Sequence, residues 1–209
     1  MINNMRVIGI TGGSGAGKGE VSHCFMSHGI RTLDTDKVSR AVCEPGKPCL
    51  NELVGHFGGE ILREDGTLNR RLLASIVFGE EDPDKKLEKL AALNRITHHY
   101  ILEDINAWLG RREKDGCRLV VVDAPQLFES GFNRHCDYTI GVIADEEVRI
   151  RRIIARDNIS RESAEKRIKS QKSDEFFIEN CDFTVYNNNG LEALEGQVGN
   201  ILEKINYKK

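Results

Sequence analysis

Three observations predict an α/β fold in which a parallel sheet is covered by helices on both faces. Short apolar, β-branched segments alternate with helical patterns along the 209 residues of the chain. A glycine-rich stretch within RVIGITGGSGAGKGEV (6–21) joins the first predicted strand to the first predicted helix. One connection between strands is far too long to be a simple crossover. Strand–helix alternation implies right-handed crossovers between parallel strands.

The individual elements follow from hydrophobic period and from turn residues. Five strands are expected, at 7–11, 30–36, 118–125, 137–143 and 182–186, each a short apolar or β-branched run with turn residues beside it. The first helix is expected to begin near Lys18 and to stop at Gly29. Further helical patterns in this part of the chain cover 145–156, 161–172 and 191–205.

The long connection runs from Asp34, near the end of strand two, to Leu119 at the start of strand three. A crossover takes only about a dozen residues, so this segment is expected to form a helical lobe. We therefore expect an α/β core at 1–36 and 117–209 and an inserted helical lobe at 37–116. The motifs described below assign nucleotide binding to the core, with a lid at about 149–180, and acceptor binding to the lobe.

Within this lobe, Asp82 and Pro83 form a typical N-cap and first-residue pair for a long helix. The apolar positions of that helix are expected at Leu87, Leu90, Leu93, Ile96, Ile101, Ile105 and Trp108. A purely structural helical extension is the alternative to a lobe that binds a substrate.

Composition excludes several classes of protein. The net charge of −3 argues against a general nucleic-acid-binding protein. No apolar run reaches membrane-spanning length, and no basic stretch precedes an apolar segment at the N-terminus, so a cytoplasmic protein without a signal peptide is expected. Six cysteines lack zinc-site spacing and are expected to be reduced, buried thiols: Cys24, Cys43, Cys49, Cys117, Cys136 and Cys181.

The glycine-rich stretch matches a phosphate-binding loop, G-x-x-x-x-G-K-[ST], with Gly12, Gly17 and Lys18 in register. Such a loop points successive backbone N–H groups at phosphate oxygens, and the following helix adds its positive end. Lys18 is expected to bind the β- and γ-phosphates of ATP. The other expected nucleotide-binding residues of the loop are Gly13, Ser14, Gly15, Ala16 and Gly17.

The pattern fails at its last position, where a hydroxyl normally holds Mg²⁺. The chain has Gly19 there, followed by Glu20. Water can replace one neutral ligand of Mg²⁺, which needs few protein ligands, and the carboxylate of Glu20 can itself face the metal. We expect an active kinase with weakened or altered metal dependence. A loop that binds ATP without chemistry remains the alternative.

Carboxylates close two of the predicted strands. Asp34 ends strand two, beside the loop in a doubly wound sheet, and is the first candidate to accept or orient the proton of an acceptor hydroxyl. Asp36 either shares this role or caps the next helix. Asp123 ends strand three and is expected to hold Mg²⁺, directly or through water, with a plain turn residue as the alternative.

Three cations, Arg149, Arg152 and Arg156, share one face of a predicted helix. In a phosphoryl-transfer enzyme such a face suits a lid that neutralises the transferring phosphate and stacks on adenine. A solvated helix face is the alternative. Arg152 is taken as a catalytic candidate and Arg156 as an ATP-binding candidate.

Six ordered segments together resemble the dephospho-coenzyme A kinases, from about Met5 to Leu202. They are the loop, DTDKVSR (34–40), DGTLNRRLLASIVF (65–78), ITHHYI (96–101), VVVDAPQLFESG (120–131), and RDNISRESAEKRIKSQ (156–171) with DFTVYNNNG (182–190). The resemblance implies a P-loop kinase fold, a three-layer α/β/α arrangement around a five-stranded parallel sheet, with a helical coenzyme lobe and a lid.

The resemblance also implies an activity, transfer of the ATP γ-phosphate to the ribose 3′-hydroxyl of dephospho-CoA. It implies that Asp34 is the base and Lys18 the phosphate-binding lysine. The acceptor would contact Arg40, Arg70, His98, Phe128 and Glu129. ATP and dephospho-CoA are then the expected partners of a monomer or weak homo-oligomer. Departures from the family pattern are Gly19 and Glu20, Gln126, and His99. Another small-metabolite or nucleotide kinase is the runner-up.

Overall fold

The computed structural model describes residues 5–207, and these divide into two compact units. The first is Met1–Asp34 with Arg112–Lys209, and the second is Thr35–Arg111. The sequence analysis predicts these two boundaries slightly later in the chain, at 36/37 and 116/117. Each unit is described by itself below.

The first unit is built on a five-stranded, all-parallel sheet in the order β2-β3-β1-β4-β5. The strands are β1 (Arg6–Thr11), β2 (Arg31–Asp34), β3 (Leu119–Asp123), β4 (Tyr138–Ile143) and β5 (Phe183–Tyr186). All five predicted strands therefore exist, with most ends within one or two residues of the prediction. The predicted α/β class with a parallel sheet is confirmed.

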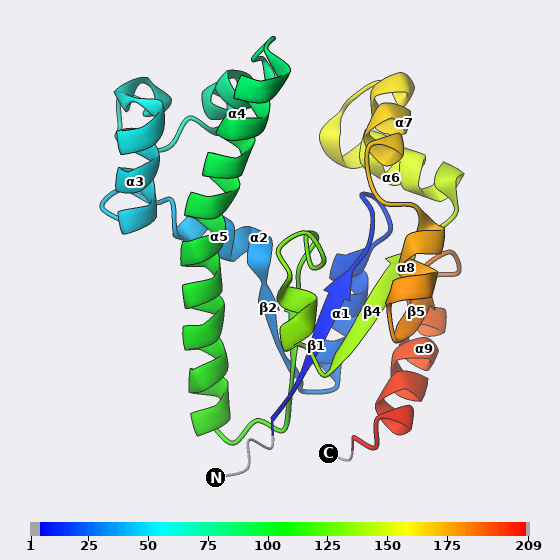
Figure 1. Ribbon diagram of the computed structural model, residues 1–209. Helices are drawn as coiled ribbons and strands as arrows, with labels where there is room; N and C mark the ends of the chain where they lie inside the picture. The colour runs from blue at the N-terminus through cyan, green and yellow to red at the C-terminus, as the bar shows by residue number, and fades with distance from the viewer. Residues whose placement is uncertain (1–4, 208–209) are drawn as a thin grey trace. The chain divides into compact units, whose positions relative to one another are not determined.

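Two helices, α1 (Lys18–Ser27) and α9 (Leu191–Lys204), pack together on one face of this sheet (Figure 1). Their apolar side chains join alternate residues of the strands, such as Ile8 and Ile10, in a fully buried core. Residues of period two along a strand face the same side, so the intervening positions face the opposite layer.

Glycines on that opposite face let the second layer approach the sheet closely. A Cβ on Gly9 would lie 2.8 Å from the Cys136 sulfur, and one on Gly141 would lie 2.9 Å from Cβ of Phe177. Phe177 belongs to α8 (Asp174–Asn180), while Cys136 follows the short 3-10 helix η2 (Phe132–His135). The sheet is therefore covered on both faces, as the strand–helix alternation predicts.

The segment predicted to form a lid differs in one respect from its predicted pattern. Helices α6 (Glu146–Asp157) and α7 (Arg161–Lys169) are present, but the predicted helix 161–172 stops early and a separate α8 follows. Ser170 at the end of α7 donates its hydroxyl to the Arg167 carbonyl, and Ser173 caps α8. Serine side chains that bond locally to the backbone favour helix ends over helix interiors, which explains the break.

The second unit is helical, as expected for the long connection. It contains α2 (Thr35–Ala41), α3 (Pro48–Phe57), the 3-10 helix η1 (Gly59–Ile61), α4 (Arg70–Phe78) and most of α5 (Pro83–Lys114). The predicted Asp82–Pro83 start of α5 is confirmed, because Oδ1 of Asp82 accepts the N–H groups of Asp84 at 3.0 Å and Lys85 at 3.3 Å.

Two expectations about burial are wrong in part. Leu87 is exposed rather than inward, and the buried positions of α5 are Ala92, Ile96 and Ile105. Near the start of so long a helix, apolar periodicity alone does not tell which turns have a packing partner. Of the six free cysteines, Cys24, Cys43 and Cys49 are buried, whereas Cys117, Cys136 and Cys181 are only half-buried.

Candidate functional site

The glycine-rich loop connects β1 to α1 in a conformation that only glycine adopts easily. Gly12, Gly15 and Gly17 have φ values of 146°, 77° and 92°, all in the region that side chains disfavour. Helix α1 begins at Lys18, directly after Gly17. The Lys18 ammonium donates to the Gly12 carbonyl at 3.1 Å, so its charge lies across the mouth of the loop. The strand–loop–helix context that the motif requires is confirmed.

Close packing behind the loop gives a second reason for its glycines. A Cβ on Gly12 would lie 2.2 Å from the carbonyl oxygen of Val142. A Cβ on Gly13 would lie 2.1 Å from Nη2 of Arg149, and one on Gly15 would lie 2.7 Å from the Arg149 carbonyl oxygen. The loop therefore rests directly against the end of β4 and the first turns of α6.

Three of the four arginines of α6 turn toward this loop. Arg149 donates its Nε to the carbonyl of Ser14 at 3.0 Å, and Arg152 donates Nη1 to the carbonyl of Gly15 at 3.2 Å. Arg156 donates Nη2 to the Ser14 hydroxyl at 3.3 Å. Arg149 is only 4% exposed. The alternative of a merely solvated helix face is therefore wrong for Arg149 and Arg152, whereas Arg156 is exposed.

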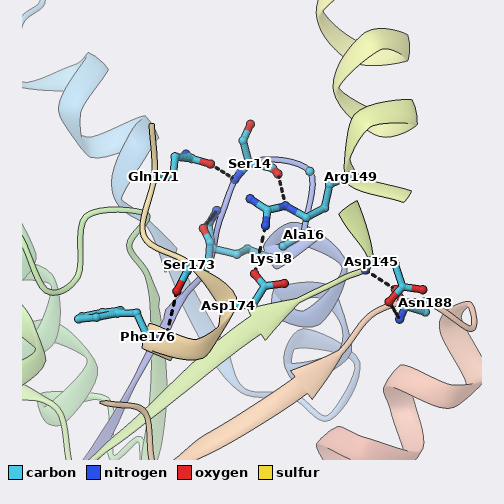
Figure 2. Close-up of polar contacts among 12 residues, drawn as sticks. Ser14, Ala16, Lys18, Asp145, Arg149, Gln171, Ser173, Asp174, Phe176 and Asn188 are labelled. Carbon is cyan, nitrogen blue, oxygen red and sulfur yellow. Dashed lines mark hydrogen bonds and ion pairs between the residues drawn. The ribbon is translucent and has the colours of Figure 1, made fainter. Parts of the chain in front are cut away.

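Helix α8 reinforces this contact through an ion pair. Nη1 of Arg149 lies 3.1 Å from Oδ1 of Asp174, in the first turn of α8 (Figure 2). Burial raises the pKa of the Asp174 carboxyl, and the positive charge of Arg149 opposes that shift. Just before α8, Oε1 of Gln171 accepts the backbone N–H of Ser14 at 2.8 Å. Sequence reasoning missed Gln171 and Asp174 as neighbours of the loop.

A buried asparagine, Asn187, contacts the far side of the loop. Sequence reasoning missed this residue as well. Asn187, only 2% exposed, follows β5 and donates Nδ2 to the carbonyl of Ala16 at 3.0 Å. Its Oδ1 accepts Nη2 of Arg152 at 3.3 Å. The run of three asparagines after the last strand was the available signal, since buried amides are retained where they satisfy backbone groups.

The two strand-end carboxylates are neighbours in the sheet. Asp34 and Asp123 are paired in register at the carboxyl ends of β2 and β3. Ser22, a buried residue of α1, donates its hydroxyl to Oδ2 of Asp123 at 3.0 Å and thereby orients that carboxylate. Sequence reasoning missed Ser22. In a doubly wound sheet, ligands bind at this edge of the strands.

These residues fit Mg²⁺ as a weakly protein-bound ion. Among residues 5–207, no three His, Cys, Asp or Glu side chains cluster as a metal site. Magnesium, however, usually keeps several waters and binds one or two carboxylates together with substrate phosphates. The Asp123 carboxylate, which lies at the sheet edge and is oriented by the Ser22 hydroxyl, suits that mode.

The two departures in the loop motif have different surroundings. A Cβ on Gly19 would have no heavy atom of residues 5–207 within 4 Å, apart from its chain neighbours and the backbone of its own helix, so a larger side chain has room there. Glu20 is exposed, and its Oε2 lies 2.7 Å from the position that a Cβ on Gly17 would take. The Glu20 carboxylate therefore lies against the end of the loop at the start of α1.

Comparison with known proteins agrees with this geometry over almost the whole chain. The family model for dephospho-CoA kinase matches residues 6–193. The chain belongs to the dephospho-CoA kinase family. A dephospho-CoA kinase of Fusobacterium nucleatum is 39% identical over 202 residues, covering 97% of this chain and all of that one.

Solved structures show the same fold for this dephospho-CoA kinase family member. The crystal structure of TT1252 from Thermus thermophilus has a TM-score of 0.81 and 32% identity, covering 97% of this chain and 98% of the other. Dephospho-CoA kinase from Campylobacter jejuni, 23% identical, has a TM-score of 0.68 and covers 95% of this chain and 96% of its own. The resemblance seen in the sequence, the P-loop kinase fold and the enzyme class are thereby confirmed.

The residues predicted to contact the acceptor are divided between the two units. In the first unit, Phe128 and Glu129 lie between β3 and η2 and contact the segment around α8. The rings of Phe128 and Phe176 meet edge-to-face with centroids 5.1 Å apart, and Glu129 lies 3.7 Å from the Lys172 ammonium. These two residues thus lie beside the same segment that carries Gln171.

In the second unit, two of the three predicted acceptor residues of the dephospho-CoA kinase pattern are linked through α2. Arg40 lies in the last turn of α2, and Arg70, the first residue of α4, donates Nη2 to the Ser39 carbonyl at 3.0 Å. His98 lies in the middle of α5 and is half-buried. Asp36 lies in the first turn of α2, which begins one residue earlier at Thr35.

A thiol pair that the sequence did not suggest lies beside Arg70. The sulfurs of Cys43 and Cys49 are 3.7 Å apart and buried. The hydrogen bond from Cys49 and the charge of Arg70 outweigh burial and lower the pKa of Cys43 to about 7. The pKa of Cys49 is raised, because its thiol donates that hydrogen bond and is buried.

Proposed function

We propose that this enzyme transfers the γ-phosphate of ATP to the ribose 3′-hydroxyl of dephospho-CoA, the last step of coenzyme A biosynthesis. The single observation that carries the proposal is the phosphate loop in its glycine-dependent conformation, in a chain that matches the family from residue 6 to 193. Within residues 5–207, no helix combines the length and the apolarity that a membrane span needs. A cytoplasmic monomer or weak homo-oligomer is part of the proposal.

The loop binds the ATP phosphates in this proposal. Its N–H groups form the anion-binding concavity, and Lys18 adds a positive charge that already lies across the mouth. Arg156 contributes a second cation, divided between the Ser14 hydroxyl at 3.3 Å and the neighbouring Asp157 carboxylate at 2.8 Å. The residues assigned to ATP are Gly13, Ser14, Gly15, Ala16, Gly17, Lys18, Gly19, Glu20 and Arg156.

Asp34 serves as the base that accepts or orients the proton of the attacking hydroxyl. Its support is its place at the end of β2, in register with Asp123 at the edge where ligands bind. Arg152 stabilises negative charge during transfer, from a position where it also contacts the carbonyl of Gly15. Phosphoryl transfer depends mainly on such positioning and charge stabilisation.

Mg²⁺ would be held by Asp123, with Glu20 as a second carboxylate in place of the usual loop hydroxyl. When bound, the metal supplies charge neutralisation on the phosphates. Ser22 holds Asp123 in position for this role.

Arg40, Arg70 and His98 of the helical unit bind the acceptor, together with Phe128 and Glu129. Their support is the family pattern at each of these positions. The cations suit the phosphate groups of dephospho-CoA, and the phenyl ring suits its apolar or aromatic parts.

The decisive experiment incubates the protein with ATP, Mg²⁺ and dephospho-CoA and measures CoA and ADP by mass. Formation of both supports the proposal. ADP formed only with another acceptor would identify a different metabolite kinase, and ATP binding without turnover would identify a non-catalytic relative.

The Asp34→Asn variant tests the assigned base in the same assay. Loss of a general base typically lowers the rate about 10²–10⁴-fold. We expect that loss in kcat with nearly unchanged ATP binding. Asp104→Asn, an exposed carboxylate of α5, is the control. A change under about threefold for Asp34→Asn would exclude the residue from the mechanism.

A further inference from the structure

One hydrogen bond in the loop is made by a group that no part of the proposed mechanism uses. The backbone N–H of Ser14 donates to the side-chain Oε1 of Gln171 at 2.8 Å (Figure 2). The two residues are 157 positions apart, and Gln171 is an exposed residue of the turn between α7 and α8. A backbone N–H of a phosphate loop is a phosphate-binding group by its chemistry.

The turn that carries Gln171 is well anchored. The Gln171 backbone N–H donates to the Ile168 carbonyl at 3.1 Å, which fixes it to the end of α7. Three residues later, Asp174 is bound to Arg149 at 3.1 Å. The turn that carries the Gln171 carboxamide is thus fixed at both ends. Its contact with Ser14 therefore follows from how α7 and α8 are packed.

Ser14 is held from three directions by the same part of the chain. Its carbonyl accepts Nε of Arg149 at 3.0 Å, its hydroxyl accepts Nη2 of Arg156 at 3.3 Å, and its N–H is taken by Gln171. The two arginines bind oxygens of Ser14 and do not occupy its N–H group. Of these three side chains, Gln171 is the one that competes directly with an incoming oxygen.

The competition favours the phosphate. An amide N–H has one proton and makes one good hydrogen bond. The Gln171 oxygen is an uncharged acceptor, whereas a phosphate oxygen is anionic and bonds roughly twice as strongly. A polyphosphate that enters the loop would therefore displace the carboxamide, but the lost bond subtracts from the affinity.

We infer that Gln171 is a placeholder that occupies the Ser14 N–H group in the nucleotide-free enzyme and must leave it when a nucleoside triphosphate binds. The inference rests on the proposed function only in taking the loop as the polyphosphate site. It makes Gln171 a residue that lowers the affinity for ATP by occupying a group that the phosphates need.

The test measures affinities of ATP and of inorganic triphosphate by calorimetry, without acceptor. Removing the side chain in Gln171→Ala removes a bond that must be broken, so both ligands should bind about two- to tenfold more tightly. Gln171→Glu places a charged acceptor at the same N–H and repels the phosphates, so both should bind at least about tenfold more weakly. Asn200→Ala and Asn200→Asp, at an exposed site on α9, are matched controls expected to leave both affinities unchanged.

The sign of the alanine effect decides the inference. A direct phosphate ligand or a purely structural residue would give weaker binding in Gln171→Ala, and either weaker or unchanged binding overturns the placeholder role. Thermal unfolding verifies that each variant is folded. If the parent protein binds neither ligand, the proposed function fails together with this inference. If the parent binds both and only the expected tightening is missing, the inference alone fails.

Discussion

At the scale of single residues, Gly19 and Glu20 are the two departures from the phosphate-loop pattern. Gly19 lies in open space, so nothing in the packing of residues 5–207 requires a glycine there. Glu20 lies in the first turn of α1, where the helix end favours an acidic side chain by about 0.3–1 kcal/mol. The loss of the hydroxyl therefore does not disturb the loop, and its consequence is confined to the metal.

Gly19→Ser should strengthen Mg²⁺ activation of turnover at low metal concentration. The serine hydroxyl would replace an ordered water, which recovers at most about 2 kcal/mol of immobilisation entropy. If Glu20 serves the metal, Glu20→Thr alone should impair activity and the serine should rescue it. Magnesium titrations of kcat for the parent, both single variants and the double variant measure this. An unchanged metal dependence in both single variants would contradict the assignment of this loop to the metal.

At the scale of elements, the link between α2 and α3 brings two thiols together. Cys43 follows α2, and Cys49 lies in the first turn of α3, with Pro48 at its start. The turn between them contains Gly46 with φ 82°, which allows the chain to reverse. Arg70 at the start of α4 completes the group. Three helices of the second unit thus meet at one ionisable pair.

This pair should make the stability of the protein depend on pH in a defined window. The pKa of Cys43 is lowered from 9.0 to about 7, so its contribution is fully present above about pH 9 and is lost as pH falls through 7. Relative to Cys43→Ser, the parent should gain roughly 1–3 kcal/mol of unfolding free energy between these values. Above that window the raised pKa of Cys49 reverses the trend, because the unfolded state then ionises more readily.

Urea unfolding at several pH values measures this difference. Cys117→Ser, which changes a half-buried thiol outside the pair, is the control and should keep the stability gain of the Cys43 thiol between pH 7 and 9. A constant difference between the parent and Cys43→Ser from pH 7 to 9 would show that the Cys43 thiol titrates normally.

At the scale of the whole molecule, the proposed chemistry belongs to one unit, and three of the five proposed acceptor residues belong to the other. The loop, both strand-end carboxylates and the arginines of α6 belong to the first unit, whereas Arg40, Arg70 and His98 belong to the second. A long crossover of helices can change the acceptor without disturbing the sheet, because loops and insertions carry specificity on a rigid scaffold.

Changes in the helical unit should therefore affect the acceptor more than ATP. We expect His98→Ala and Arg70→Ala to raise the KM for dephospho-CoA by about tenfold or more, as loss of a hydrogen bond to a charged group does, with little change for ATP. His99→Ala is the neighbouring control, since His99 is exposed and lies 3.6 Å from Glu103. Steady-state kinetics with each substrate varied gives the answer. Equal effects on both substrates would argue against an acceptor-binding lobe.

The sequence by itself determined the order of strands and helices, the register of the phosphate loop and the placement of Asp34 and Asp123 at strand ends. These are local properties, because period, capping and turn chemistry are encoded within a few neighbouring residues. The order of the strands in the sheet, with β1 between β3 and β4, was decided by the tertiary structure.

Only the tertiary structure decided which side chains surround the loop. Arg149 has the same local pattern as an arginine on a solvated face, and its burial follows from packing against Gly13 and Gly15. Gln171 and Asn187 reach the loop from more than 150 positions away in the chain. Such contacts have no period and no spacing rule. They depend on how layers of the fold pack together, so no segment of the sequence carries them alone.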